Sequence, residues 1–228
     1  MNTQTEVLGG SSIALPAERQ RVLRNTYALL AVSMIPTVLG AWVGVATGIT
    51  SLMSPMIGLV VFLAGAFGFM FAIQKYRNSG LGVALLLGFT FFMGLMLARL
   101  LGMVLSMSNG TSLVMMAFAG TSAAFFGMAL LSSVVKRDLS GLAKFLFIGA
   151  IGILVVGIAN VFIQSGALMM TLSVLAVLVF SAFILVDLKR VRDGEETNYV
   201  TATLGVYLSL YNVFQSLLAL FGIAGGED

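Results

Sequence analysis

The chain has no cysteine and no histidine, and only 9% of its 228 residues are charged. Without cysteine it can form neither a disulfide nor a thiolate metal site. Without histidine it lacks the commonest metal ligand and the usual general base of enzymes. Soluble domains carry about 25% charged residues, whereas this chain is 59% hydrophobic. A water-soluble fold of this size could not bury so much apolar surface, so lipid must be the solvent for most of the chain.

Long apolar segments fill most of the sequence. A helix crosses a bilayer when roughly 20 consecutive residues are mostly apolar, because the hydrocarbon core is about 30 Å thick. Short breaks with Gly, Ser, Asn or Asp separate the segments. Seven segments qualify, near Tyr27–Val45, Pro55–Ile73, Leu81–Ser106, Ser112–Val135, Leu142–Phe162, Ala167–Leu188 and Tyr199–Gly222. The sequence therefore predicts an all-α membrane protein, a bundle of seven transmembrane helices.

The basic residues are distributed unevenly between alternate connections. Eleven of the twelve lysines and arginines lie in the N-terminal tail and in or beside the second, fourth and sixth loops. Cytoplasmic loops carry the excess of Lys and Arg. This pattern predicts a cytoplasmic N-terminus and an external C-terminus, and it explains the net charge of +3 without nucleic acid as a partner. The predicted parts are a cytosolic tail (1–26), a membrane domain (27–222) and a short external tail (223–228).

The N-terminal tail divides into two parts. Met1 to Ser12 is polar and rich in Gly, Ser and Thr, which predicts an unstructured segment. Pro16 then opens a predicted short helix, because proline suits the start of a helix. The arginines of this helix are expected among anionic lipid headgroups, each attracted by about 1 kcal/mol.

Apart from Lys144, which is counted with the fourth loop, two charged residues lie within the predicted spans. At the centre of a membrane helix such a residue costs about 2.5–3.5 kcal/mol, so each requires an explanation. Arg99 is expected to reach external water from the outer end of the third span. Asp187 ends the sixth span, where it either pairs with Arg190 on the same helix face or faces the seventh span. In the second case a symmetric hairpin would bring Asp187 and Ser209 to similar depth.

The seventh span is the most polar. Ser209, Asn212 and Ser216 recur at helical spacing and form one stripe. Asn160 and Gln164 of the fifth span lie one turn apart and could face this stripe. Hydrogen bonds among these groups, worth about 0.6–2 kcal/mol each, either tie the helices together or line a permeation or binding path. Glycines of other spans fit close helix packing: Gly65, Gly68, Gly120, Gly149, Gly152 and Gly157.

The C-terminal third contains a long and specific motif. It consists of Gly194-Glu-Glu-Thr-Asn-Tyr-Val-Thr-Ala-Thr203 followed by Val206-Tyr-Leu-Ser-Leu-Tyr-Asn-Val-Phe214. This motif closely resembles the C-terminal signature of the Bax inhibitor-1 (transmembrane Bax inhibitor motif) family, in particular its bacterial YccA-like branch. Shorter matches at residues 22–27, 120–126 and 158–164 extend the resemblance, which spans residues 22 to 226.

The resemblance implies a seven-helix bundle in a bacterial inner membrane, with the last helix central and wrapped by the other six. It also implies one of two functions. The YccA-like branch is associated with the membrane-anchored AAA protease FtsH, as a substrate-like modulator. Other members are described as pH-sensitive calcium leaks gated by two aspartates on the sixth and seventh helices. Here the first position matches Asp187, but the second is Ser209, so the paired carboxylates of that gate are absent.

Enzymatic chemistry is not expected. Serine–histidine and zinc proteases of the membrane require histidine, and an aspartyl intramembrane protease requires two aspartates where the spans offer only Asp187. No phosphate-binding or dinucleotide fingerprint is present, and no cofactor or metal is predicted. We therefore expect a regulatory partner of an FtsH-type protease, with Met1, Asn2, Thr3 and Gln4 beginning the handle that the protease grips. The alternative is a calcium or other cation leak, with Asp187, Ser209, Asn212 and Asn160 as gating or bundle-locking residues.

Overall fold

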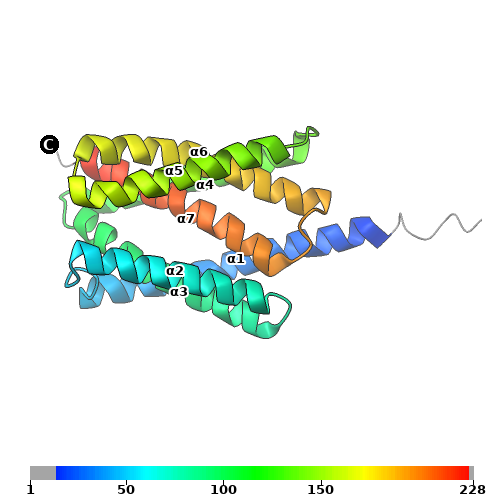
Figure 1. The fold of residues 1–228 in the computed structure, drawn as a ribbon, viewed down its shortest axis with the longest axis horizontal. Coiled ribbons are helices and arrows are strands. Elements are labelled where there is room, and N and C mark those ends of the chain that lie inside the picture. The colour runs from blue at the N-terminus through cyan, green and yellow to red at the C-terminus, as the bar shows by residue number, and fades with distance from the viewer. Residues whose placement is uncertain (1–13, 226–228) are drawn as a thin grey trace, which may run out of the picture.

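The computed structural model describes residues 14–225, with side chains from residue 17 onward (Figure 1). The seven helices of this range are α1 (Ala14–Thr47), α2 (Pro55–Tyr76), α3 (Gly80–Leu105), α4 (Gly110–Val134), α5 (Ser140–Ile163), α6 (Gly166–Asp193) and α7 (Tyr199–Ala224). Each helix is long and apolar enough to cross a membrane. The predicted all-α class and the seven spans are confirmed, and each span falls on one helix.

Helix α1 is longer than the sequence predicted. It begins at Ala14 and runs without a break into the first span, so the short helix expected from Pro16 is not separate. The physical reason is that residues 17–26 contain neither glycine nor proline, the residues that end helices. The start of α1 projects beyond the other helices in Figure 1. There Arg19 packs against the connection between α6 and α7, with its Nε 2.6 Å from the position that a Cβ of Gly194 would take.

Helix α6 also continues past its predicted end at Leu188. Lys189 pairs with Asp193 one turn later, which stabilises the extra turn. Gly194 then ends the helix in the left-handed conformation, with φ +84°, and its backbone N–H bonds to the carbonyl of Val191. Asp187 consequently lies six residues, or about 9 Å, before the last residue of α6 rather than at its end.

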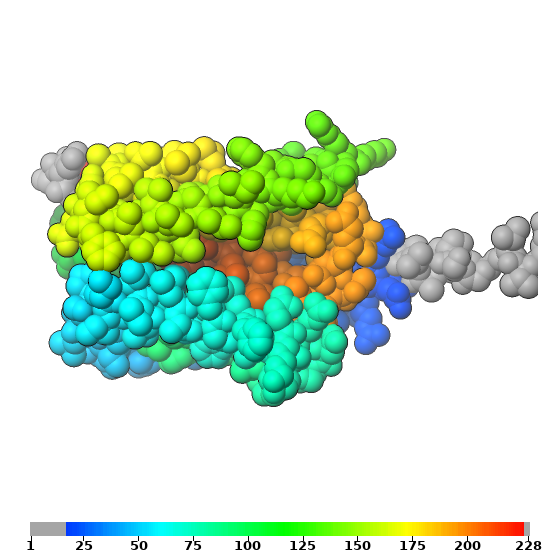
Figure 2. Space-filling model, viewed as in Figure 1, coloured from blue at the N-terminus to red at the C-terminus, as the bar shows by residue number. Residues whose placement is uncertain are grey.

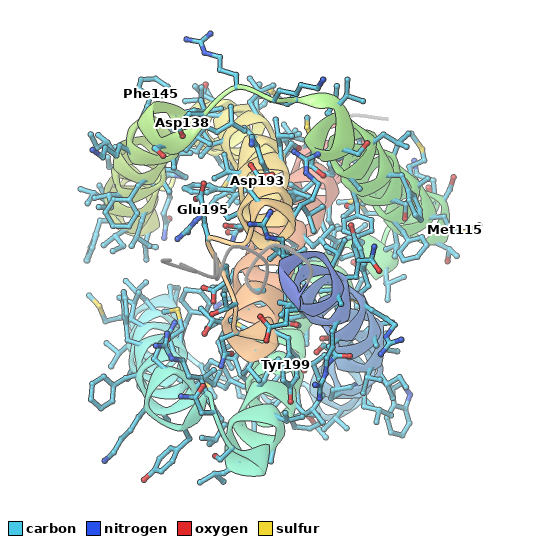
Figure 3. The ribbon with its side chains drawn as sticks, turned by 90° about the vertical axis from the view of Figure 1, so that its right-hand side faces the viewer. Met115, Asp138, Phe145, Asp193, Glu195 and Tyr199 are labelled. Atoms are coloured by element: carbon cyan, nitrogen blue, oxygen red, sulfur yellow. The ribbon has the colours of Figure 1, made fainter. Side chains whose placement is uncertain are left out.

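Helix α7 lies at the centre of the bundle. It has thirteen buried residues, more than any other helix of the described chain. Seen from the end in Figure 3, it runs between a group formed by α4, α5 and α6 and a group formed by α1, α2 and α3. Within the described residues it contacts α1, α2, α3, α4 and α6, whereas α5 packs against α6 and α2. The expected central last helix is present, but it is wrapped by five helices and not by six.

The closest helix approach joins α1 to α3. A Cβ on Gly40 would overlap the carbonyl oxygen of Phe91, and a Cβ on Gly94 would overlap that of Thr37. The two backbones therefore touch, which only glycine permits. Not all of the glycines that the sequence analysis assigned to close helix packing lie at such contacts. Cβ atoms on Gly68, Gly152 and Gly157 would meet open space.

The outer surface of the bundle is apolar. Phe71, Leu130 and Phe145 are 74%, 71% and 71% exposed, and Trp42 is 67% exposed. Met115 and Phe145 point away from the bundle in Figure 3. Such a surface suits contact with lipid chains and not with water.

Candidate functional site

The hairpin of α6 and α7 is held by the cap of α7. Asn198 accepts hydrogen bonds from the backbone N–H groups of Val200 and Thr201 at 3.0 and 3.1 Å. Its amide nitrogen donates to the carbonyl of Arg77 and to the side chain of Asn78, at 3.1 and 2.8 Å. Asn198 therefore starts α7 and ties it to the connection between α2 and α3, which fixes one end of the space between α2, α6 and α7.

The side chain of Asp187 faces α7. Its Oδ2 is 3.1 Å from the position that a Cβ of Gly205 would take, so the carboxylate lies directly over that glycine. Arg190 does not pair with it. The Nε of Arg190 is instead 3.7 Å from Oε2 of Glu195. Of the two interpretations open from the sequence, the local ion pair with Arg190 is wrong and the inward-facing carboxylate is correct.

A groove of about 550 Å³ lies beside this carboxylate. Helix α2 supplies Phe67, Met70, Phe71 and Gln74, while α6, α7 and their connection supply Asp187, Arg190, Glu196 and Leu208 among others. In the side view of Figure 2 the molecule is hollowed between α2 and α5, and α7 is visible at the bottom of the hollow. The site is therefore an apolar groove with a few charged groups, and its lining comes from three helices.

Ser209 is buried, with 4% of its surface exposed. It lies four residues beyond Gly205, or about 6 Å farther along α7. The expected pairing of Asp187 with Ser209 at equal depth is thus displaced by one helical turn. The displacement follows from the hairpin, because α6 extends to Asp193 and its connection to α7 is short.

Two other residues named from the sequence make local hydrogen bonds. Asn212 donates to the carbonyl of Leu208 on its own helix at 2.8 Å. Asn160 bonds in both directions to the backbone of Ser165, at 3.2 and 3.0 Å, and so closes the turn between α5 and α6. Gln164 is exposed at the end of α5 with φ +54°. Because α5 does not contact α7 within the described residues, the expectation that Asn160 and Gln164 face the α7 stripe is wrong.

Hydrogen bonds that join α7 to α1 and α3 come from Tyr207 and Thr203 and not from the stripe of Ser209, Asn212 and Ser216. The hydroxyl of Tyr207 lies 2.9 Å from Oγ1 of Thr37 on α1 and donates to the carbonyl of Thr90 on α3 at 3.4 Å. Thr203 donates to the carbonyl of Thr26 on α1 at 3.3 Å. A buried tyrosine needs a partner for its hydroxyl, and that requirement was the available signal for Tyr207.

Arg99 lies at the opposite end of the bundle from Asp187. Its Nη1 donates to the carbonyl of Met53 in the connection between α1 and α2, at 3.5 Å. This long bond places the guanidinium beside a loop at the end of the bundle. That position agrees with the interpretation that Arg99 reaches toward water from the end of its helix. The proposed handle, which begins with Met1, Asn2, Thr3 and Gln4, lies outside the described residues.

Comparison with known proteins identifies the family. Residues 19–226 match the family model described as "Inhibitor of apoptosis-promoting Bax1". The chain belongs to the Bax inhibitor-1 family. The resemblance carried by the C-terminal motif is thereby confirmed, and the central, polar α7 described above is the helix that contains most of that motif.

Several bacterial relatives cover nearly the whole chain. The Escherichia coli K12 protein named "Modulator of FtsH protease YccA" is 36% identical over 207 residues, which are 91% of this chain and 92% of that protein. A Vibrio cholerae protein named only as an uncharacterized membrane protein is 36% identical over 96% of both chains. The protein of E. coli O6:H1 is named "Inner membrane protein YccA". With its seven candidate spans, this member of the family is a multi-pass protein of the bacterial inner membrane.

Proposed function

We propose that this protein modulates a membrane-anchored AAA protease of the FtsH type by acting as a substrate that the protease releases slowly. The observation that carries the proposal is the 36% identity, over 91% of the chain, with the E. coli protein named as a modulator of that protease. The name of that relative fits a regulatory role better than a catalytic one. The absence of histidine from the sequence points the same way.

The N-terminal segment supplies the handle in this proposal. An AAA motor needs a polar segment that it can grip on its own side of the membrane, and residues 1–12 are polar by composition. This requires a cytoplasmic N-terminus. Basic residues lie at the start of α1 and in the connections that follow α2, α4 and α6. They support that orientation, because cytoplasmic loops are rich in Lys and Arg.

The packing of α1 explains why extraction would be slow. A pull on the N-terminus acts first on α1, whose backbone touches α3 through Gly40 and Gly94. The same helix is hydrogen-bonded to α7 through Thr37 and Tyr207. Removing α1 exposes both contacts to lipid, which offers no replacement hydrogen bonds. A protease that holds such a substrate is occupied and degrades others more slowly. The test is whether loss of residues 2–12 abolishes both turnover and modulation.

A cation leak is the second candidate. The observation in its favour is Asp187, a carboxylate within the membrane domain that lines a groove. The observation against it is Ser209, which stands where the leak-forming members of the family are described as having a second aspartate. Two carboxylates can share a proton across a range of pH, and an aspartate with a serine cannot.

A further inference from the structure

The groove beside Asp187 contains a carboxyl group that makes no ion pair within the described residues. Within residues 17–225 the ion pairs near the end of α6 join Lys189 and Arg192 to Asp193, and Arg190 to Glu195. None includes Asp187. A carboxylate within a membrane domain is normally paired with a cation or a hydrogen-bond donor, because its charge is costly in a medium of low dielectric constant. Arg190 lines the groove as well, but its ion pair is with Glu195, so no cation of the described residues lies within ion-pair distance of Asp187.

The depth of Asp187 matches a lipid headgroup. Helix α6 has 28 residues, which corresponds to about 42 Å, close to the 40–45 Å thickness of a bilayer with its headgroups. Asp187 is about 9 Å from the last residue of this helix. It thus lies near the boundary between headgroups and hydrocarbon, where an ammonium group attached to an acyl chain can reach it.

The walls of the groove fit an acyl chain. Phe67 and Phe71 of α2 are 57% and 74% exposed and line its outer side, and Leu208 lines it from α7. The hollow in Figure 2 opens on the side of the bundle, where lipid is the neighbour. Gly205 has no side chain, which allows the carboxylate of Asp187 to lie against the α7 backbone at the edge of the groove.

The lining of the groove includes two acidic side chains and one basic side chain. Asp187 and Glu196 supply negative charge and Arg190 supplies positive charge. We propose that this groove binds one phospholipid with an ethanolamine headgroup. Its primary ammonium donates hydrogen bonds to Asp187, and one acyl chain lies along Phe67, Phe71 and Leu208.

A primary ammonium distinguishes this lipid from related ones. It has three N–H donors, whereas the quaternary ammonium of a choline headgroup has none and a glycerol headgroup has no positive charge. The proposal is independent of the proposed function, because it concerns the side of the bundle and not the N-terminal segment. It also differs from a cation leak, since the occupant is held by its chain and does not pass through the protein.

The test is lipid retention measured by native mass spectrometry. The full-length protein is equilibrated in detergent with equal amounts of ethanolamine, choline and glycerol phospholipids that have identical acyl chains. The ethanolamine lipid should be retained about tenfold more than the choline lipid, which is the difference expected from a charge-assisted hydrogen bond. Asp187→Asn should reduce this ratio to about one. Glu18→Gln, which removes an exposed acid on α1 outside the groove, should leave it unchanged.

Two further measurements keep the result interpretable. Gly205→Val should lower retention of the ethanolamine lipid by pushing the carboxylate away from its position over residue 205. Each variant is first shown to elute as a single helical species. Free ethanolamine and calcium chloride, each at millimolar concentration, should not displace the bound lipid. Equal retention of ethanolamine and choline lipids by the unmodified protein would overturn the proposal. Preference that survives Asp187→Asn, or displacement by ethanolamine or calcium alone, would overturn it as well.

Discussion

The carboxylate of Asp187 lies over the backbone of Gly205, with Oδ2 3.1 Å from the position of a Cβ on that glycine. A side chain at position 205 would therefore press on the carboxylate. Gly205→Val is expected to destabilise the protein by about 1–3 kcal/mol through overpacking. Gly152→Ala is the matched control, because a Cβ there meets open space and the change from glycine favours the helix. Thermal unfolding in a mild detergent measures both; equal stability of the two variants would contradict the contact.

Tyr207 joins three helices through one hydroxyl, which lies 2.9 Å from Oγ1 of Thr37 and 3.4 Å from the carbonyl oxygen of Thr90. Tyr207→Phe keeps the ring and removes these bonds, so we expect a loss of about 0.6–2 kcal/mol in the free energy of unfolding. Tyr76→Phe is the control, since Tyr76 is 40% exposed at the end of α2. A Tyr207→Phe protein as stable as the control variant would show that these bonds contribute nothing.

Membrane orientation is predicted from the basic connections. We expect the N-terminus in the cytoplasm and the C-terminus outside. An odd number of spans puts the two chain termini on opposite sides of the membrane. The basic connections lie on the same side as the N-terminus, which is therefore the cytoplasmic side. A reporter that is active only outside, fused after Asp228, should be active. The same reporter inserted in the connection between α6 and α7 should be silent. The reverse pattern would remove the N-terminal handle from the reach of a cytosolic motor.

The serine at position 209 predicts weak ion conduction. Protein reconstituted in vesicles should show little calcium flux between pH 6 and 8, because the second carboxylate of the family's gate is absent. Ser209→Asp puts a second carboxylate one helical turn from the level of Asp187, and this variant should show pH-dependent flux. Asp187→Asn in that background should remove the flux. Robust flux through the unmodified protein that depends on pH and is lost in Asp187→Asn would make the leak the primary function.

The sequence predicted the architecture well because lipid imposes a simple rule on composition. Seven apolar segments had to become seven helices, and they did. Helix ends were harder to predict, since the extra turn of α6 depends on the Lys189–Asp193 pair and on the cap at Gly194.

Contacts between helices were predicted least well. Apolarity shows that a helix crosses the membrane, but it does not show which face meets which neighbour. Asn160 appeared able to face α7, and it instead closes the turn at Ser165. Gly40 and Gly94 make the closest backbone contact without standing out among the 26 glycines of the chain. Asp187 was the exception, because a charge within a membrane segment is costly enough to single out its residue.

The most direct measurement of the proposed function uses the purified FtsH-type protease with a second membrane substrate in the same vesicles. Adding the full-length protein should slow degradation of the second substrate severalfold, while the protein itself is degraded slowly. A variant without residues 2–12 should fold equally well, resist degradation and leave the second substrate unprotected. If the full-length protein leaves degradation of the second substrate unchanged, or if the truncated variant protects it equally well, the account of a slowly extracted substrate held by its N-terminus is contradicted.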